Sequence, residues 1–284
     1  MNILVTGASG QLGSEIKEEV KSLGLDNYFF EDSKGLDISN LDMVLNYVEE
    51  NEIEVIINCA AYTAVDKAES EEIKAQKVNA LGVLNLVNAI KGKGRIIHIS
   101  TDYVFNGKGH IPYKEIDLVD PIGVYGKTKR KGEEQILNSE VESIIIRTSW
   151  VYSSYGNNFV KTMLRLGEER EELGVIFDQV GSPTYARDLA RVCIKLSKED
   201  FKNKSKIYHY SNEGVLSWYD FARAIMEIGN VNCNIKPIET KDYPTPAKRP
   251  SYSLMNKTKI KEDFNVSIPY WRDSLKDCIK KIKN

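Results

Sequence analysis

Short apolar runs alternate with segments of helical spacing along the first half of the chain. Runs rich in isoleucine and valine predict five β-strands, at residues 2–7, 28–31, 54–60, 95–100 and 142–149. These runs are nearly continuous, which is typical of parallel strands covered on both faces. Segments with apolar residues three or four positions apart predict helices between them, at residues 11–23, 40–50, 71–91 and 125–138. This repetition predicts an α/β fold with a doubly wound parallel sheet.

The pattern becomes irregular after residue 150. Apolar periodicity predicts four more helices, at residues 159–171, 185–197, 218–228 and 271–283. Further strand-like stretches occur at residues 174–177 and 206–212. Residues 242–250 hold three of the eight prolines, which predicts an extended loop. We expect residues 1–150 to form the sheet domain, with segments around 174–212 returning to it. Residues 151–284 are expected to form mainly a smaller, irregular lobe that binds substrate against the sheet.

Composition and charge narrow the possible classes of protein. The chain is 42% hydrophobic and 28% charged, with a net charge of -2, so nothing attracts it to nucleic acid or to an acidic membrane surface. Runs of about 18 apolar residues are absent, and residues 1–24 lack the features of a signal peptide. The four cysteines and three histidines are scattered without zinc-site spacing. We therefore expect a cytoplasmic protein with reduced thiols, no metal site and no nucleic-acid or membrane partner.

A glycine-rich loop follows the first predicted strand. In the stretch VTGASGQLGSEI, Gly7, Gly10 and Gly13 stand between the strand and the first helix. Such a loop turns tightly, lets the backbone approach a pyrophosphate and lets the helix pack closely on the strand, and each need excludes a β-carbon. The pyrophosphate then meets free N–H groups at the positive end of the helix. The loop in this position predicts a dinucleotide-binding domain of the Rossmann type, rather than a plain tight turn.

Two acidic residues end the second predicted strand. Glu31 and Asp32 lie 18 and 19 residues after Gly13. An acid at this position accepts hydrogen bonds from the adenosine ribose and repels a 2′-phosphate. Lys34 is close in sequence, but no arginine is. We therefore expect NADH or NADPH as the cofactor, with NADH favoured; the alternative interpretation of the two acids is an exposed turn.

Tyr125 and Lys129 lie four residues apart on the predicted helix 125–138, so they share one face. Alone, such a pair is typical of a solvated helix face. With the glycine loop, and with Thr101 in HISTDYVFNGKG, it resembles the triad of the extended short-chain dehydrogenase/reductase family. The resemblance implies Tyr125 as the proton donor and Thr101 as the residue that orients a ketone. Lys129 would lower the pKa of the Tyr125 phenol and hold the nicotinamide ribose.

Longer blocks resemble one branch of that family, the dTDP-4-dehydrorhamnose reductases. The blocks are AAYTAVDKAES (60–70), STDYVFNG (100–107), YGKTK (125–129), RTSWVY (147–152), GNNFVKTML (156–164) and YPTPAKRP (243–250). The likeness covers nearly the whole chain. It implies hydride transfer from NADH or NADPH to the C4 keto group of dTDP-4-dehydro-L-rhamnose, in dTDP-rhamnose biosynthesis. The nucleotide-sugar 4,6-dehydratases carry a second acid after the aspartate, whereas here Asp102 is followed by Tyr103.

The resemblance also implies binding residues. Those expected to bind the cofactor are Gly7, Gly10, Gln11, Leu12, Gly13, Glu31, Asp32, Asp37, Ile38, Ala60, Ala61, Tyr62, Asn79, Tyr125 and Lys129. Those expected to bind the substrate are Val65, Asp66, Thr101, Asp102, Trp150, Asn158 and Arg249. A strand-end cap is the alternative for Thr101, and a core tryptophan for Trp150.

Other functions are open at this stage. The chain could be a reductase or epimerase for another nucleotide sugar. It could also be a non-catalytic, dinucleotide-binding regulatory subunit, because a regulatory subunit of methionine adenosyltransferase is similar to this family. Some family members bind magnesium at a dimer interface, and Glu15 matches one of the acids involved. Arg187 stands where another acid would be, so we do not expect a magnesium-bridged dimer. We expect a small-molecule nucleotide-sugar substrate and a monomer or homodimer.

Overall fold

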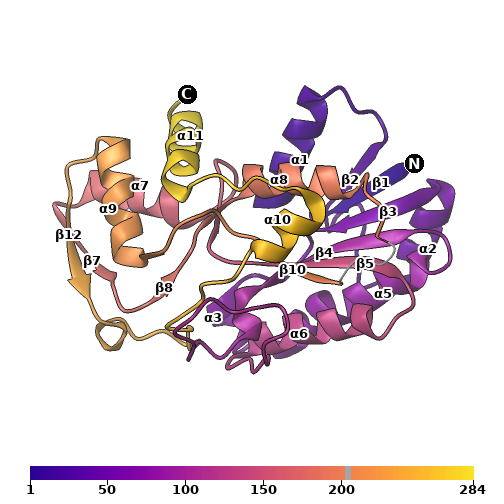
Figure 1. The fold of residues 1–284 in the computed structure, drawn as a ribbon, viewed down its shortest axis with the longest axis horizontal. Helices are drawn as coiled ribbons and strands as arrows, with labels where there is room; N and C mark the ends of the chain where they lie inside the picture. The colour runs from indigo at the N-terminus through magenta and orange to yellow at the C-terminus, as the bar shows by residue number, and fades with distance from the viewer. Residues whose placement is uncertain (202–205) are drawn as a thin grey trace.

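The main element of the fold is a parallel sheet of six strands in the order β10–β5–β4–β3–β1–β2 (Figure 1). A computed structural model describes residues 1–201 and 206–284. The sheet strands are β1 (Asn2–Thr6), β2 (Tyr28–Glu31), β3 (Ile53–Asn58), β4 (Arg95–Thr101), β5 (Glu142–Thr148) and β10 (Ile207–His209). The predicted parallel α/β sheet is confirmed, and the stretch predicted at 206–212 supplies its sixth strand.

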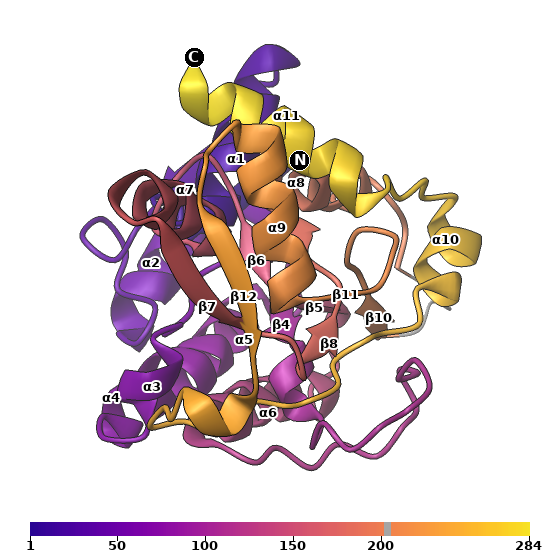
Figure 2. The ribbon, with the colours of Figure 1, turned by 90° about the vertical axis from the view of Figure 1, so that its left-hand side faces the viewer.

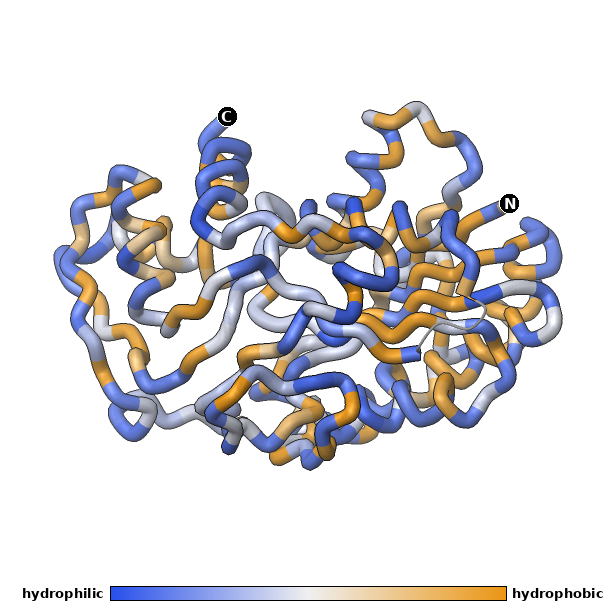
Figure 3. The backbone as a smooth tube through the Cα atoms, in the orientation of Figure 1, coloured by the Kyte–Doolittle hydropathy of each residue, from blue (hydrophilic) through white to orange (hydrophobic). Residues whose placement is uncertain are grey.

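Helices cover both faces of the sheet, which explains why its strands are apolar almost throughout. One face carries α1 (Gln11–Ser22), α8 (Ala186–Leu196) and α10 (Thr258–Phe264). The other carries α2 (Leu41–Glu50), α5 (Gly82–Ile90) and α6 (Val124–Leu137). Within β1, Ile3 and Val5 pack toward α1 and α8, whereas Leu4 packs toward α2 and α5. Figure 3 shows the apolar residues concentrated along these strands.

A second core, separate from those that cover the two faces of the sheet, lies beside the sheet (Figure 1). It is built by α7 (Phe159–Glu169), α9 (Trp218–Gly229), α11 (Trp271–Lys283), β7 (Glu172–Ile176) and β12 (Asn234–Ile238). Three short pairs of strands accompany it: β12 with β7, β11 (Leu216–Ser217) with β8 (Val180–Gly181), and β6 (Val151–Tyr152) with β9 (Thr184–Tyr185). Figure 2 shows α9 beside β7 and β12 at this end of the molecule. A short 3₁₀ turn, η3 (Thr240–Asp242), follows β12.

The segment predicted as one helix over 71–91 is more irregular than expected. It contains α4 (Glu72–Gln76), a π-helical turn η1 (Lys77–Leu81) and then α5. The short helix α3 (Val65–Ala68) precedes them, and the 3₁₀ turn η2 (Asp102–Val104) follows β4. Single π turns inside α-helices are frequent at functional sites.

The strand order determines where a ligand can bind. The chain runs from β1 outward to β2 and then returns to β3 on the other side of β1, so the winding reverses between β1 and β3. In open α/β sheets, the crevice at the carboxyl ends of the strands at this reversal is the usual ligand site. Across the described ranges, no helix has the length and apolar character needed to cross a bilayer.

Candidate active site

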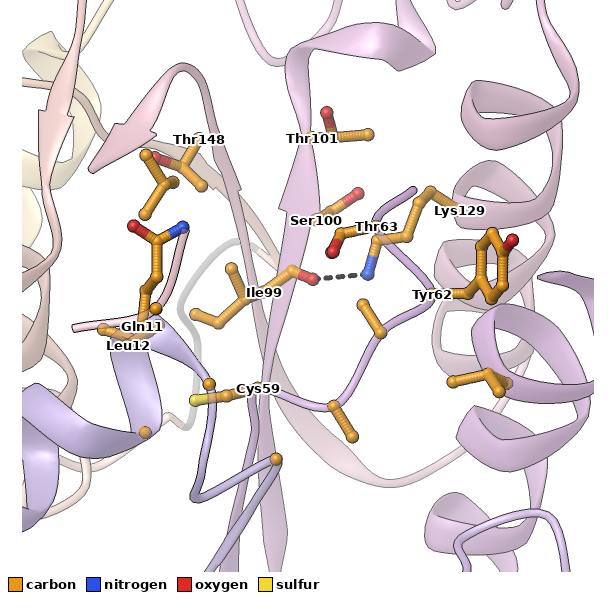
Figure 4. Close-up of a pocket in the computed structure, with 18 of the residues that line it drawn as sticks. Gln11, Leu12, Cys59, Tyr62, Thr63, Ile99, Ser100, Thr101, Lys129 and Thr148 are labelled. Atoms are coloured by element: carbon orange, nitrogen blue, oxygen red, sulfur yellow. Dashed lines mark hydrogen bonds between the residues drawn. The ribbon is translucent and has the colours of Figure 1, made fainter. Parts of the chain in front are cut away.

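A cleft of about 770 Å³ opens at the carboxyl ends of the central strands. Its walls come from the glycine loop after β1, the ends of β3, β4 and β5, the start of α6 and the loop before α7 (Figure 4). Most residues predicted from the sequence line it: Gly7, Gly10, Gln11, Leu12, Gly13, Asp32, Asp37, Ile38, Ala60, Ala61, Tyr62, Val65, Thr101, Asp102, Tyr125, Lys129, Trp150 and Asn158. The fold therefore gathers segments that are far apart in sequence.

Four predicted residues do not line the cleft, and each of them forms hydrogen bonds with another side chain. The Tyr47 hydroxyl donates to Glu31 Oε1 at 2.9 Å, so Asp32 is the acid that faces the cleft. Asp66 and Arg249 form a two-bond ion pair, with Arg249 Nη2 2.8 Å from Asp66 Oδ2 and Nη1 3.1 Å from Oδ1. This pair ties the proline-rich loop to α3, and Arg249 lowers the pKa of Asp66.

Asn79, the fourth, is fully buried on the π-helical turn. Its Oδ1 accepts from the backbone N–H of Tyr62 at 2.8 Å, and its Nδ2 donates to the Thr128 hydroxyl at 3.1 Å. Asn79 therefore holds the loop after β3 against α6 and acts on the cleft through Tyr62, which lines it.

The glycine loop fits a bound dinucleotide. Gly7 has a φ of +67°, and a Cβ there would lie 2.7 Å from the Ala60 nitrogen. A Cβ on Gly13 would lie 2.6 Å from the Ala8 Cα, so loop and helix could not stay in contact. The N-terminus of α1 borders the cleft through Gly10 and Gln11, where free N–H groups suit a pyrophosphate.

Substitution of Gly13 by alanine is expected to weaken cofactor binding at least about tenfold, or about 1.4 kcal/mol, because the backbone must move away from the added Cβ. Titration of the protein with NADH or NADPH, followed by nicotinamide fluorescence, measures the change. Gly24→Ala is the control. Unlike Gly13, Gly24 has a positive φ, +64°, and a Cβ there meets no atom within 4 Å in the described structure. That variant should lose stability and keep its cofactor affinity, so equal losses of affinity would contradict the argument.

Thr101, Tyr125 and Lys129 converge on the cleft from two elements. Thr101 ends β4, and the other two lie on the first turns of α6. The Thr101 hydroxyl donates to Asp102 Oδ1 at 3.0 Å and accepts from the Tyr103 backbone N–H at 3.2 Å. Thr101 thus caps the turn η2, as its alternative interpretation requires, and also lines the cleft.

The electrostatics of Tyr125 differ from the prediction. Burial raises the pKa of the Tyr125 phenol to about 12, although a hydrogen bond with Thr101 lowers it, and the Asp102 charge raises it further. The prediction that Lys129 lowers this pKa is therefore wrong. The reason is geometric, since Lys129 Nζ donates to the Ile99 carbonyl oxygen at 2.6 Å (Figure 4). A phenol that keeps its proton at neutral pH remains available as an acid.

The pKa values of Lys129 and Asp102 are both shifted toward neutral pH. Burial lowers the pKa of Lys129 to about 8, although Glu133 and Cys59 favour the charged form. Burial raises the pKa of Asp102 to about 7, although a hydrogen bond with Thr101 opposes this. Titratable groups whose pKa values are moved this far in a cleft are typical of active sites.

Glu133 is a residue that the sequence analysis missed. It is fully buried on α6 and accepts two hydrogen bonds of 2.8 Å from Arg147 on β5, and one of 2.6 Å from the Ser100 hydroxyl on β4. This ion pair fixes the catalytic helix against the sheet. The sequence signal for such a residue was Arg147, which is a charged residue inside an apolar strand. A charge buried there requires a buried partner of opposite charge.

Trp150 lines the cleft in an unusual conformation. Its φ is +48°, which is rare for a bulky residue and is typical of functional sites. Its ring stacks on that of Trp218 with 3.7 Å between the ring centroids, and a Cβ on Gly181 would lie 3.1 Å from the indole. The tryptophan is thus held between α9 and β8 at the wall of the cleft, rather than in the interior of the core.

Asn158 is the N-cap of α7, since its Oδ1 accepts from the Lys161 backbone N–H at 3.2 Å. Its Nδ2 donates to Gln11 Oε1 at 3.0 Å and to the Ser153 carbonyl oxygen at 2.7 Å. The loop before α7 is therefore held against the start of α1, at the glycine-loop end of the cleft.

The acidic residues considered for magnesium do not fit a metal ion. Glu15 is fully buried, and its Oε1 accepts from the Ser153 hydroxyl at 2.5 Å while its Oε2 lies 3.0 Å from Lys281 Nζ. Arg187 Nε lies 2.5 Å from Glu19 Oε1. Internal cations thus neutralise these carboxylates. Within residues 1–201 and 206–284, no group of three histidine, cysteine or acidic side chains is placed to hold a metal.

A Rossmann sheet, a glycine-loop cleft and a Thr–Tyr–Lys constellation define a dinucleotide-dependent reductase of the extended short-chain type. The family model described as the RmlD substrate binding domain matches residues 1–284. A dTDP-4-dehydrorhamnose reductase of Aggregatibacter actinomycetemcomitans is 44% identical over 286 residues, 97% of each chain. The chain belongs to the dTDP-4-dehydrorhamnose reductase family.

Solved structures agree with this assignment. A dTDP-4-dehydrorhamnose reductase from Clostridium acetobutylicum has a TM-score of 0.95 and 41% identity over the whole of both chains. One from Bacillus anthracis, in complex with NADP, has a TM-score of 0.93 and 39% identity, covering 99% of this chain and 100% of the other. The expectation of a nicotinamide dinucleotide cofactor is confirmed.

Proposed function

We propose that the protein transfers a hydride from NADH or NADPH to the C4 keto group of dTDP-4-dehydro-L-rhamnose, giving dTDP-L-rhamnose. The observation that carries this is the convergence of Thr101, Tyr125 and Lys129 on the cleft that the glycine loop also lines. The names of relatives that align over nearly the full chain support the substrate. The function belongs to the biosynthesis of dTDP-rhamnose.

Tyr125 is proposed as the general acid. When bound, the dinucleotide supplies the hydride, and the C4 oxygen needs a proton as its negative charge develops. The phenol holds its proton at neutral pH and can donate it to that oxygen. The hydroxyl of Thr101 orients the ketone, and the ammonium of Lys129 would hold the nicotinamide ribose.

Binding roles are proposed for the other predicted residues. Gly7, Gly10 and Gly13 would hold the pyrophosphate, and Asp32 the adenosine ribose, which favours NADH. The residues proposed to contact the sugar nucleotide are Val65, Asp102, Trp150 and Asn158, all of which line the cleft. Asp66 and Arg249 are proposed to contact it only after their ion pair opens, so that the guanidinium can bind a phosphate.

The pH dependence of the reaction follows from Lys129. Burial lowers the pKa of this amine to about 8, so the ammonium is present below that pH and is lost above it. We expect kcat/KM for ketone reduction to fall as the pH rises through about 8. A rate profile between pH 6 and pH 10 measures this limb. Lys129→Arg keeps its charge over the whole range. In this variant the limb should disappear, and an unchanged limb would assign it to another group.

Turnover by the purified protein tests the function. The protein is incubated with NADH or NADPH and enzymatically made dTDP-4-dehydro-L-rhamnose, while the nicotinamide absorbance is followed and the product identified. Parallel reactions use other nucleotide 4-keto sugars. Preferential formation of dTDP-L-rhamnose supports the proposal. Faster reduction of another sugar points to a different substrate, and no turnover, with a partner enzyme recovered, points to a regulatory subunit.

Organisation and location remain predictions. We propose residues 1–150, with the returning segments around 174–212, as the dinucleotide-binding domain, and residues 151–284 as mainly the substrate lobe. The protein is proposed to work in the cytoplasm as a monomer or homodimer.

A further inference from the structure

His98 is a fully buried residue of β4 that the proposed mechanism does not use. Its Nδ1 lies 2.9 Å from Asn58 Nδ2, and its Nε2 lies 3.3 Å from Lys129 Nζ. The ring thus connects the end of β3 to a catalytic side chain on α6. Burial and the charge of Lys129 hold the pKa of His98 well below its ordinary value, so the ring is neutral.

The hydrogen bonds of Asn58 determine which ring nitrogen of His98 carries the proton. Asn58 Oδ1 accepts from the Ala60 backbone N–H at 3.1 Å and from the Thr6 hydroxyl at 2.7 Å. A backbone N–H can only donate, so the atom facing Ala60 must be the amide oxygen. The amide NH₂ of Asn58 therefore faces His98 and donates to Nδ1. A neutral ring that accepts at Nδ1 carries its proton on Nε2.

This tautomer points an N–H at Lys129. An ammonium group has three donors and no acceptor, so the ammonium form would place two donors against each other. The neutral amine has a lone pair that accepts from His98 Nε2–H, and it still donates to the Ile99 carbonyl oxygen at 2.6 Å. The contact between His98 and Lys129 therefore favours the neutral amine.

We propose that His98 is a positioning residue for the reaction proposed above: by donating Nε2–H to Lys129, it favours the neutral amine and holds Nζ at the Ile99 carbonyl. The tautomer imposed by Asn58 then sets the pH above which the ammonium is lost. The effect of His98 on catalysis rests on the proposed function. The hydrogen bonds from Asn58 through His98 to Lys129 are independent of it.

The other titratable groups near Lys129, Glu133 and Cys59, form no hydrogen bond with its Nζ among the described residues. Glu133 lies one turn further along α6 and is bound by Arg147 of β5 and by Arg130. Cys59, after β3, stays a neutral thiol because burial raises its pKa to about 12. Among the described residues, the hydrogen-bond partners of Lys129 Nζ are Ile99 and His98.

A long-range ¹H–¹⁵N spectrum of the histidine rings tests the tautomer without any turnover. We expect His98 in the Nε2–H form. His209, which is also buried, is an internal reference: its Nδ1 lies 3.1 Å from the Tyr113 carbonyl oxygen, so it should show the opposite, Nδ1–H form. His98→Gln assigns the signals. An Nδ1–H or doubly protonated His98 would overturn the proposal, whether or not the protein reduces the sugar.

Asn58→Asp tests the coupling to Lys129. The new carboxylate accepts from Nδ1–H, so the ring proton moves and Nε2 becomes an acceptor for the ammonium. We expect the tautomer to switch, and the titration of Lys129 to move up by at least about one pH unit, tenfold in proton affinity. The ¹³Cε signal of labelled lysine and the alkaline limb of kcat/KM both measure this shift.

The added negative charge alone also favours the ammonium, so a control is needed. The double variant Asn58→Asp with His98→Gln keeps the carboxylate and lacks the ring. The proposal requires a clearly smaller shift of Lys129 in the double variant than in Asn58→Asp. Equal shifts in the two variants would overturn it, and so would an unchanged tautomer in Asn58→Asp.

Discussion

Replacement of Tyr125 by phenylalanine is expected to lower kcat by about 10³-fold, within the usual contribution of a general acid. The reason is that the developing alkoxide at C4 loses its proton donor. Burial raises the pKa of the phenol to about 12, so it holds its proton at neutral pH and well above it. Affinity for NADH and NADPH should change little, since the ring remains. Stopped-flow decay of the nicotinamide absorbance measures the chemical step, and fluorescence titration measures cofactor binding.

Tyr28→Phe is the matched control for loss of a tyrosine hydroxyl. Tyr28 lies on β2, and its hydroxyl is 3.0 Å from the Ser197 hydroxyl. This variant should lose about 1 kcal/mol of stability and keep its kcat. If Tyr125→Phe reduces the ketone at the wild-type rate, Tyr125 is not the acid.

The second large effect is expected on stability, from Glu133→Gln. Arg147 is 1% exposed and forms two 2.8 Å hydrogen bonds with Glu133. Removing one charge of a buried pair leaves the other uncompensated, which typically costs about 3–5 kcal/mol of unfolding free energy. Urea unfolding followed by circular dichroism measures the change. Activity should fall as well, because the pair holds α6 against the sheet.

An exposed ion pair gives the control. Arg165 and Glu169 lie four residues apart on α7, with side chains 59% and 51% exposed. Glu169→Gln should change the unfolding free energy by less than about 0.5 kcal/mol, because solvent screens the charges. Replacement of both buried partners, Glu133→Leu with Arg147→Met, should recover much of the loss. Equal effects at the exposed and buried pairs would contradict the account.

The sequence predicted the architecture because the relevant signals are local. Apolar runs without alternation predicted parallel strands, and the helices predicted at 159–171, 185–197 and 271–283 lie within two residues of α7, α8 and α11. The structure departs from the predicted single helix at η1, a π turn on which Asn79 bonds to Tyr62 and Thr128. Local propensity contains no information about such partners.

Part of the candidate site could likewise be predicted from local signals, and part depends on tertiary contacts. The glycine loop, Thr101, Tyr125 and Lys129 were all found from short motifs, and all line one cleft. Glu31, Asp66, Asn79 and Arg249 do not line this cleft, because other side chains bind them. Asp66 and Arg249 are 183 positions apart, and their pairing follows from the docking of the proline-rich loop on α3.

The sequence by itself determined the fold class and the cofactor loop, because each depends on residue types at short spacings, and a family resemblance in its motifs identified the reactive trio. Only the tertiary structure decided the electrostatics. Burial raises the pKa of Tyr125 and lowers that of Lys129, and the Ile99 carbonyl and His98 determine where the Lys129 amine points. Desolvation and hydrogen bonding depend on every neighbour in space, and those neighbours come from strands and helices that only folding brings together.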